Sequence, residues 1–187
     1  MSVELALVER CLSGEVAAQL ELVRRFELDV LRLCTKLLRD RHEAEDVAQE
    51  VFLRVFRSLH RWDRARPLKP WVLTITVNRC RTALGKRMKR PTTADYLAEL
   101  PQRSPMDSSA ELVQAVAGCV AELRQDYREV FVLYHETGHN YEEIAEIVGR
   151  PVGTVKTWLH RARLLLSAAL TERGLLPSAP LPSTTQP

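Results

Sequence analysis

The segment from Asn140 to Arg163 constrains this chain most, because it has the features of two helices separated by a tight turn. Asn140 can cap the first helix through its side-chain oxygen, and Glu143, three residues later, can reach back to the cap. Gly149 suits a left-handed backbone at the end of that helix, and Pro151 discourages its continuation. The pattern predicts a helix-turn-helix, the unit that places its second helix in the major groove of DNA.

The second helix of this unit has an apolar side and a basic side. Its apolar residues recur at three- and four-residue spacing, as on one helix face: Val155, Leu159, Ala162 and Leu166. Thr154 can cap or open the helix. Residues 150–163 contain no acid, so the polar side is suited to DNA phosphates and base edges. On charge alone, the alternative is a solvated basic helix on an ordinary bundle.

The remaining sequence predicts an all-α protein of two small helical domains joined by a flexible linker. The 187 residues are 45% hydrophobic, include only seven glycines and show few strand-like alternations. We expect a first domain over 1–90, with helices near 3–13, 15–39, 41–59 and 71–89, and a second over 110–173 that contains the helix-turn-helix. Prolines and small polar residues mark 91–109 as the linker, and 174–187 as a disordered tail.

Charge and cysteine content narrow the classes of protein further. The net charge is only +3, so any nucleic-acid surface must be local. The four cysteines form no CxxC pair, which favours reduced core residues over disulfides or a metal site. No apolar run is long enough to cross a bilayer, and the N-terminus lacks a signal-peptide pattern. We therefore expect a cytoplasmic protein without membrane insertion, metal or cofactor.

A second constellation lies between Asp40 and Trp62. Glu43, Asp46 and Glu50 recur at three- and four-residue spacing and therefore share one helix face, with Gln49 beside them. Such a partly acidic, exposed face can dock a basic partner. An ordinary solvated face is the alternative.

Taken together, two segments resemble those of bacterial sigma factors. AEDVAQEVFLRVF, residues 44–56, resembles the helix that binds core RNA polymerase, and YEEIAEIVGRPVGTVKTWLHRAR, residues 141–163, resembles the helix-turn-helix that reads the −35 promoter element. Their order and the intervening linker resemble the extracytoplasmic-function (ECF) group, which keeps only sigma regions 2 and 4. The resemblance covers about residues 5–173.

The resemblance implies roles for three sets of residues. Binding of core polymerase falls to Asp46, Gln49 and Glu50, whereas Phe52 on the same helix belongs to the core. Recognition and melting of the −10 element by residues 62–90 fall to Arg64, Arg66, Lys69, Trp71, Asn78, Arg79 and Arg81. Recognition of −35 by the helix over 153–163 falls to Thr154, Lys156, Thr157, His160, Arg161 and Arg163. Trp62 near the loop over 63–69 suits stacking on a flipped base.

The resemblance also implies the protein's partners. A sigma factor carries core polymerase to promoter DNA for transcription initiation and is not itself an enzyme. A partner anti-sigma factor could wedge between the two domains and cover both DNA faces, and a monomer is expected for the free chain. Trp158 stands where the family usually has a basic residue, which puts the usual −35 preference in question.

Two other functional classes compete with this interpretation. His135, Glu136 and His139 match HExxH, the zinc-hydrolase pattern, in which two histidines one turn apart bind the metal. We expect the helix that carries His135 to end before His139, because Gly138 is typical of a helix end and Asn140 of the cap of a new helix. A stand-alone helix-turn-helix regulator would use the second domain but would have no need of the acidic face near Asp46.

Overall fold

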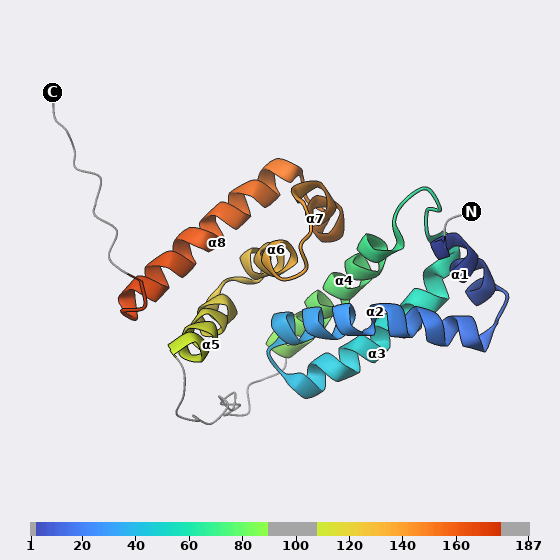
Figure 1. Ribbon diagram of the computed structural model, residues 1–187, viewed down its shortest axis with the longest axis horizontal. Helices are drawn as coiled ribbons and strands as arrows, with labels where there is room; N and C mark the ends of the chain where they lie inside the picture. The colour runs from blue at the N-terminus through green and yellow to red at the C-terminus, as the bar shows by residue number, and fades with distance from the viewer. Residues whose placement is uncertain (1–2, 90–107, 177–187) are drawn as a thin grey trace.

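The computed structural model describes residues 3–89 and 108–176, and over these ranges the chain is all-α, as predicted (Figure 1). The first domain contains α1 (Val3–Leu12), α2 (Val16–Leu38), α3 (Arg41–Ser58), a 3₁₀ turn η1 (Leu59–Arg61) and α4 (Leu68–Lys89). The second contains α5 (Ser108–Glu122), α6 (Gln125–His135), α7 (Tyr141–Val148) and α8 (Val152–Glu172). Most of the predicted linker and tail lies outside the described residues.

In the first domain, α2 is the central helix and packs against α1, α3 and α4. Its apolar face is buried against theirs, with Leu22, Leu33, Val51 and Leu73 all at 0% exposure. The corner from α2 to α3 is set locally: Arg39 takes a left-handed conformation that ends α2, and the Asp40 carboxylate accepts the Glu43 backbone N–H at 2.9 Å. This corner turns α3 back along α2 and leaves the acidic face of α3 exposed to solvent.

The start of α4 differs from the prediction. The helix begins at Leu68, three residues before the predicted Trp71, and so includes Pro70. A proline is tolerated in the first turn because the N–H it lacks would have no partner there. The Leu68 N–H instead donates to the carboxylate of Glu4 in α1, at 3.2 Å, and the Leu68 side chain is fully buried. A contact from a distant helix therefore decides where α4 begins.

The helix-turn-helix has the predicted caps. Asn140 accepts the Glu143 backbone N–H at 2.9 Å, and Glu143 accepts the Asn140 N–H at 3.0 Å, which completes a capping box. Gly149 has a φ of 68° and ends α7. The four apolar residues predicted to face inward on α8 are buried. The prediction for Thr154 is wrong: α8 begins at Val152, so Thr154 lies within the first turn and does not cap it.

We predict that Asn140→Ala lowers the free energy of unfolding by about 1 kcal/mol, because the N-terminal turn of α7 loses its side-chain cap. Urea unfolding followed by circular dichroism measures this change. Glu142→Ala is the control, since Glu142 occupies the same turn, is exposed and takes no part in the capping box. Equal shifts of the unfolding midpoint for the two variants would contradict the prediction.

Candidate polymerase- and DNA-binding surfaces

The acidic face of α3 is accessible. Asp46, Gln49 and Glu50 are exposed, while their neighbours Val47 and Ala48 are buried against α2 and α4. Glu50 forms an ion pair with Arg79 of α4. Leu53, one turn after Gln49, is 57% exposed on this same face. The sequence analysis did not single out Leu53, because a lone apolar residue on a polar helix face is common and carries no signal by itself.

The basic side of α8 also faces outward. Lys156, Thr157, His160, Arg161 and Arg163 are exposed, and Thr154 is half-buried. Two of the arginines are held by α6: Arg161 donates to the Tyr127 hydroxyl at 3.4 Å, and Arg163 donates to His135 at 3.2 Å. Lys156, Thr157 and His160 lie exposed in the first three turns of α8; the Thr157 hydroxyl donates to the Gly153 carbonyl at 2.9 Å, and Lys156 Nζ lies 5.4 Å from the Tyr141 ring centroid.

Trp158 is half-buried and packs against the core of the second domain, with the Arg150 guanidinium 6.0 Å from its ring centroid. The position where the family usually has a basic residue is therefore apolar and partly covered. Arg150 supplies a positive charge nearby from the turn that precedes α8.

The five cations predicted to contact the −10 element all pair with acids. The pairs are Arg64–Glu9 at 3.4 Å, Arg66–Glu146 at 3.2 Å, Lys69–Asp29 at 2.8 Å, Arg81–Glu129 at 2.6 Å and Arg79–Glu50. Trp71 is half-buried against the core, and Asn78 is exposed. Trp62 is only 6% exposed, so in this conformation its ring is not open to stack on a base.

A groove between α3, η1 and α4 collects cations that the sequence analysis did not single out. It has a volume of about 560 Å³ and is lined by Arg54, Arg57, Ser58, Arg61, Ile75, Asn78, Arg79 and Thr82. Arg54, Arg57 and Arg61 are exposed, and none forms an ion pair within the described ranges. Their spacing along the chain, three then four residues, is the helical signal that could have found them.

One of the arginines that line the groove has a donor without an acceptor. The Nε atom of Arg79 is buried and has no hydrogen-bond partner among the described residues. A buried N–H of this kind is costly unless an acceptor reaches it. The Nε atom is enclosed, so the suitability of the groove for phosphate oxygens rests on the four arginine side chains that line it.

The HExxH histidines do not lie on one helix. α6 ends at His135, while His139 lies in the following loop with 6% exposure. The Thr137 hydroxyl donates its only proton to the Leu133 carbonyl at 2.7 Å, so at 2.6 Å the His139 Nδ1–H donates to Thr137. Within the described part of the chain, no group of three His, Cys, Asp or Glu side chains could hold a metal ion.

Comparison with known proteins decides the family. Residues 22–90 match the model for Sigma-70 region 2, and residues 114–166 match that for Sigma-70, region 4. The ECF RNA polymerase sigma factor SigM of Bacillus subtilis is 31% identical over 158 residues, which cover 83% of this chain and 96% of SigM. The chain belongs to the ECF group of the sigma-70 family.

Other similarities extend over most of this sigma factor. The RNA polymerase sigma-H factor of Pseudomonas aeruginosa is 30% identical over 179 residues, covering 88% of this chain and 92% of that protein. The structure of CnrH in complex with the cytosolic domain of CnrY has a TM-score of 0.68 and 27% identity, and covers 89% of this chain and 96% of CnrH. The protein therefore directs RNA polymerase to promoters.

Membership in this family also explains the first domain. The region 2 match spans most of α2 and all of α3 and α4, a part that a stand-alone helix-turn-helix regulator would not need.

The described helices include none that is both long and apolar enough to span a membrane.

We predict that acid lowers the stability of this sigma factor partly through His139. Burial lowers the pKa of His139 below its ordinary value of 6.5. The unfolded chain then binds the proton more readily, so this contribution to stability is complete above about pH 6.5 and is lost as the pH falls below it. The difference in urea unfolding midpoint between wild type and His139→Gln should therefore become smaller as the pH is lowered from neutral to mildly acidic.

The exposed His42→Gln variant is the control for this experiment, because carboxylates that lose stability in acid affect all three proteins alike. A difference between wild type and His139→Gln that stays constant with pH would contradict the prediction.

Proposed function

We propose that this sigma factor binds core RNA polymerase through the α3 face formed by Asp46, Gln49, Glu50 and Leu53. The observation that carries the proposal is the exposure of three polar side chains and one apolar side chain on a helix whose other side is fully packed. A polymerase group that pairs with Glu50 would compete with Arg79 for the same carboxylate, and so would free a guanidinium in the arginine groove.

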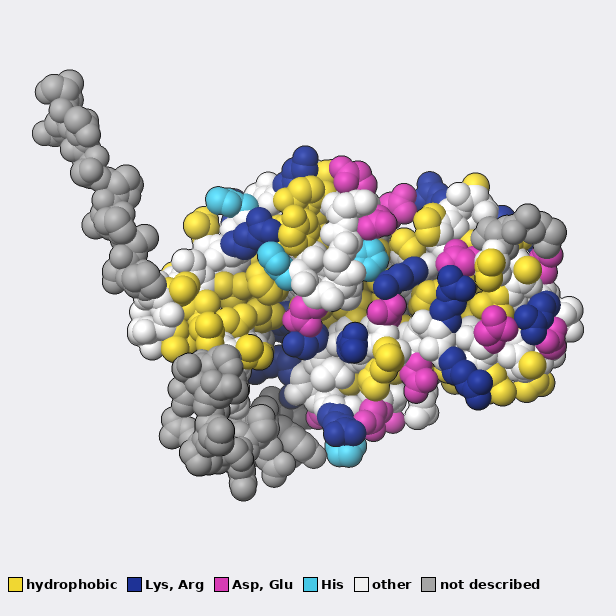
Figure 2. Space-filling model, in the orientation of Figure 1, with side chains coloured by type: hydrophobic (Ala, Val, Ile, Leu, Met, Phe, Trp, Pro, Cys, Tyr) yellow, Lys and Arg dark blue, Asp and Glu magenta, His cyan; other side chains and the backbone are white. Residues whose placement is uncertain are grey.

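Region 4 offers a second polymerase contact. Figure 2 shows apolar side chains gathered over α5 and the adjoining part of α8. The exposed members are Leu112 (41%), Val113 (69%), Leu164 (57%) and Leu165 (50%). Large exposed apolar patches of this kind are typical of protein interfaces. Leu164 lies one turn after His160 on the same side of α8, so the patch adjoins the C-terminal end of the basic side.

For −35 recognition we infer that residues 153–163 of α8 enter the major groove. Lys156, Thr157 and His160 are placed for base edges, and Arg161 and Arg163 for the DNA backbone. Thr154, half-buried at the start of the helix, is the remaining member of the predicted set.

For −10 DNA we infer that the opened strand follows the arginine groove beside Asn78 and Arg79. The unpaired cations Arg54, Arg57 and Arg61 support this path, because positively charged grooves track single-stranded backbones. Four further cations remain predicted contacts of the −10 strand: Arg64, Arg66, Lys69 and Arg81. Each would have to leave its acidic partner in order to bind a DNA phosphate. Trp71 remains the predicted aromatic contact of this strand.

The same proposal covers partners and location. We infer a cytoplasmic, non-enzymatic protein without a cofactor that is monomeric when free and is held inactive by an anti-sigma factor. The complex of CnrH with the cytosolic domain of CnrY supports such a partner. In this structure α4 packs directly on α7, so a partner that wedges between the domains would have to displace that contact.

The polymerase contact is tested by size-exclusion co-elution with bacterial core RNA polymerase. Asp46→Ala with Gln49→Ala should weaken the complex at least about tenfold, as truncation of central interface residues does. Glu27→Ala with Glu142→Ala is the control, since it removes two exposed polar side chains that lie outside α3 and outside the apolar patch on α5 and α8. Undiminished co-elution of the α3 variant would reject this face as the polymerase site.

The groove is tested by the salt dependence of binding between the reconstituted holoenzyme and single-stranded DNA. Each lost phosphate contact reduces the slope of log K against log salt by about 0.7, so Arg57→Gln with Arg61→Gln should reduce it by about 1.4. Arg24→Gln with Arg32→Gln removes the same charge from exposed positions of α2 outside the groove. Equal slopes for the two double variants would contradict the proposed path.

A further inference from the structure

Regions 2 and 4 of this sigma factor touch each other directly. α4 packs against α7, and α2 packs against α6, although the helices of each pair come from different domains (Figure 1). The contact therefore covers part of α4, the helix that carries five of the seven predicted −10 residues. The accessibility of this part of α4 therefore depends on the interactions that hold the two domains together.

A buried carboxylate lies at this contact. Glu129 of α6 is 0% exposed, and Arg81 of α4 donates from Nε to its two oxygens at 3.0 and 3.2 Å and from a terminal nitrogen at 2.6 Å. Gln125, one turn earlier on α6, adds a hydrogen bond at 2.9 Å. A buried carboxylate is tolerated only with such compensation, and here the compensating charge comes from the other domain.

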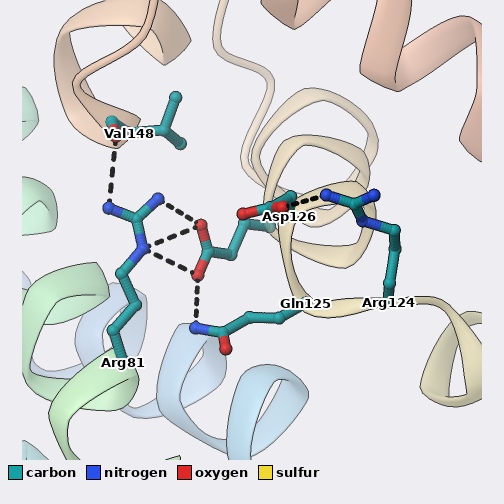
Figure 3. Close-up of polar contacts among 6 residues, drawn as sticks. Arg81, Arg124, Gln125, Asp126 and Val148 are labelled. Carbon is teal, nitrogen blue, oxygen red and sulfur yellow. Dashed lines mark hydrogen bonds and ion pairs between the residues drawn. The ribbon is translucent and has the colours of Figure 1, made fainter. Parts of the chain in front are cut away.

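The same guanidinium reaches a second helix of region 4. Its remaining terminal nitrogen donates to the Val148 carbonyl at 3.2 Å, as Figure 3 shows. Val148 is the last residue of α7, where carbonyls lack partners within the helix and a cation is favourable. Arg81 therefore ties α4 to both α6 and α7, the helix that opens the helix-turn-helix.

Further contacts between the domains are made by α2 and its end. Arg128 of α6 donates to the Leu37 carbonyl at 3.1 Å, and Arg39 donates to the Ala121 carbonyl at 3.0 Å. Lys36 pairs with the exposed Glu136 at 3.2 Å. None of these neutralises a buried carboxylate, so the Arg81–Glu129 pair is the contact whose loss leaves an uncompensated charge in the interface.

We propose that the Arg81–Glu129 pair is a latch that holds regions 2 and 4 together in the free sigma factor and keeps Arg81 from DNA. A guanidinium binds carboxylate and phosphate with the same fork of donors, so it cannot serve both at once. While the latch is closed, the basic side of α8 is still exposed, whereas Arg81 is bound to Glu129. The effect of the latch on DNA binding rests on the proposed role of α4.

The latch is tested in the full chain with donor and acceptor dyes on unnatural residues at Glu27 and Glu172, which are exposed on opposite domains. Glu129→Gln should raise the open-to-closed ratio at least about tenfold, because Arg81, whose side chain is only 29% exposed in the closed state, would lose its ionic partner there. Glu122→Gln is the matched control: it removes the same charge from an exposed pair with Arg173 inside region 4.

Two more variants separate opening from misfolding. Arg81→Gln breaks the latch from region 2 and should open the chain as Glu129→Gln does, while the helix content of each stays native. Arg81→Glu combined with Glu129→Arg should restore closure. A wild type that is already open, or single variants that remain closed with native helix content, would overturn the latch.

Binding of a short oligothymidylate, followed by fluorescence polarisation, tests the consequence for DNA. Glu129→Gln should bind it several-fold more tightly than Glu122→Gln, because the competent state is no longer a minor population. Arg81→Gln should show no such gain, since it opens the chain but lacks the contact. Opening of Glu129→Gln without this gain would keep the latch and contradict the proposed DNA role of α4, whereas failure to open would overturn the latch itself.

Discussion

The pairing of a buried carboxylate with a guanidinium from the other domain sets the relation between the two halves of this sigma factor. Glu129 is enclosed within region 4, yet its charge is compensated by Arg81 of region 2. Because a buried unpaired charge is costly, the two domains are held in one relative placement and the surfaces of α4, α6 and α7 are closed against each other. The hydrogen bond from the same guanidinium to the Val148 carbonyl makes this placement specific.

That placement divides the functional surfaces into open and closed ones. The α3 face, the arginines Arg54, Arg57 and Arg61 of the groove, and the basic side of α8 are exposed. Arg66 and Arg81 instead pair with acids of region 4, and Arg64 and Lys69 with acids of region 2. The molecule thus presents the proposed polymerase- and −35-binding surfaces, while the five cations predicted to contact the −10 element are all paired with acids.

Local chemistry explains which predictions from the sequence succeeded. The capping box at Asn140 and the left-handed Gly149 involve neighbours in the chain, and both form as expected. The start of α4 at Leu68 was missed because its cap is the Glu4 carboxylate, 64 residues away in sequence. Arg54, Arg57 and Arg61 were overlooked for a different reason: their spacing was visible, but the groove they line requires α4 beside α3.

The sequence by itself determined the helices, the helix-turn-helix and the two faces that carry the family resemblance, because caps and apolar periodicity act over a few residues. Only the tertiary structure decided which acid each arginine meets. Long charged side chains reach partners on other helices, and nothing in the local sequence distinguishes Arg81, which pairs with a buried carboxylate, from Arg57, which is exposed in a groove. Whether an arginine is available to bind DNA depends on the acid with which it pairs.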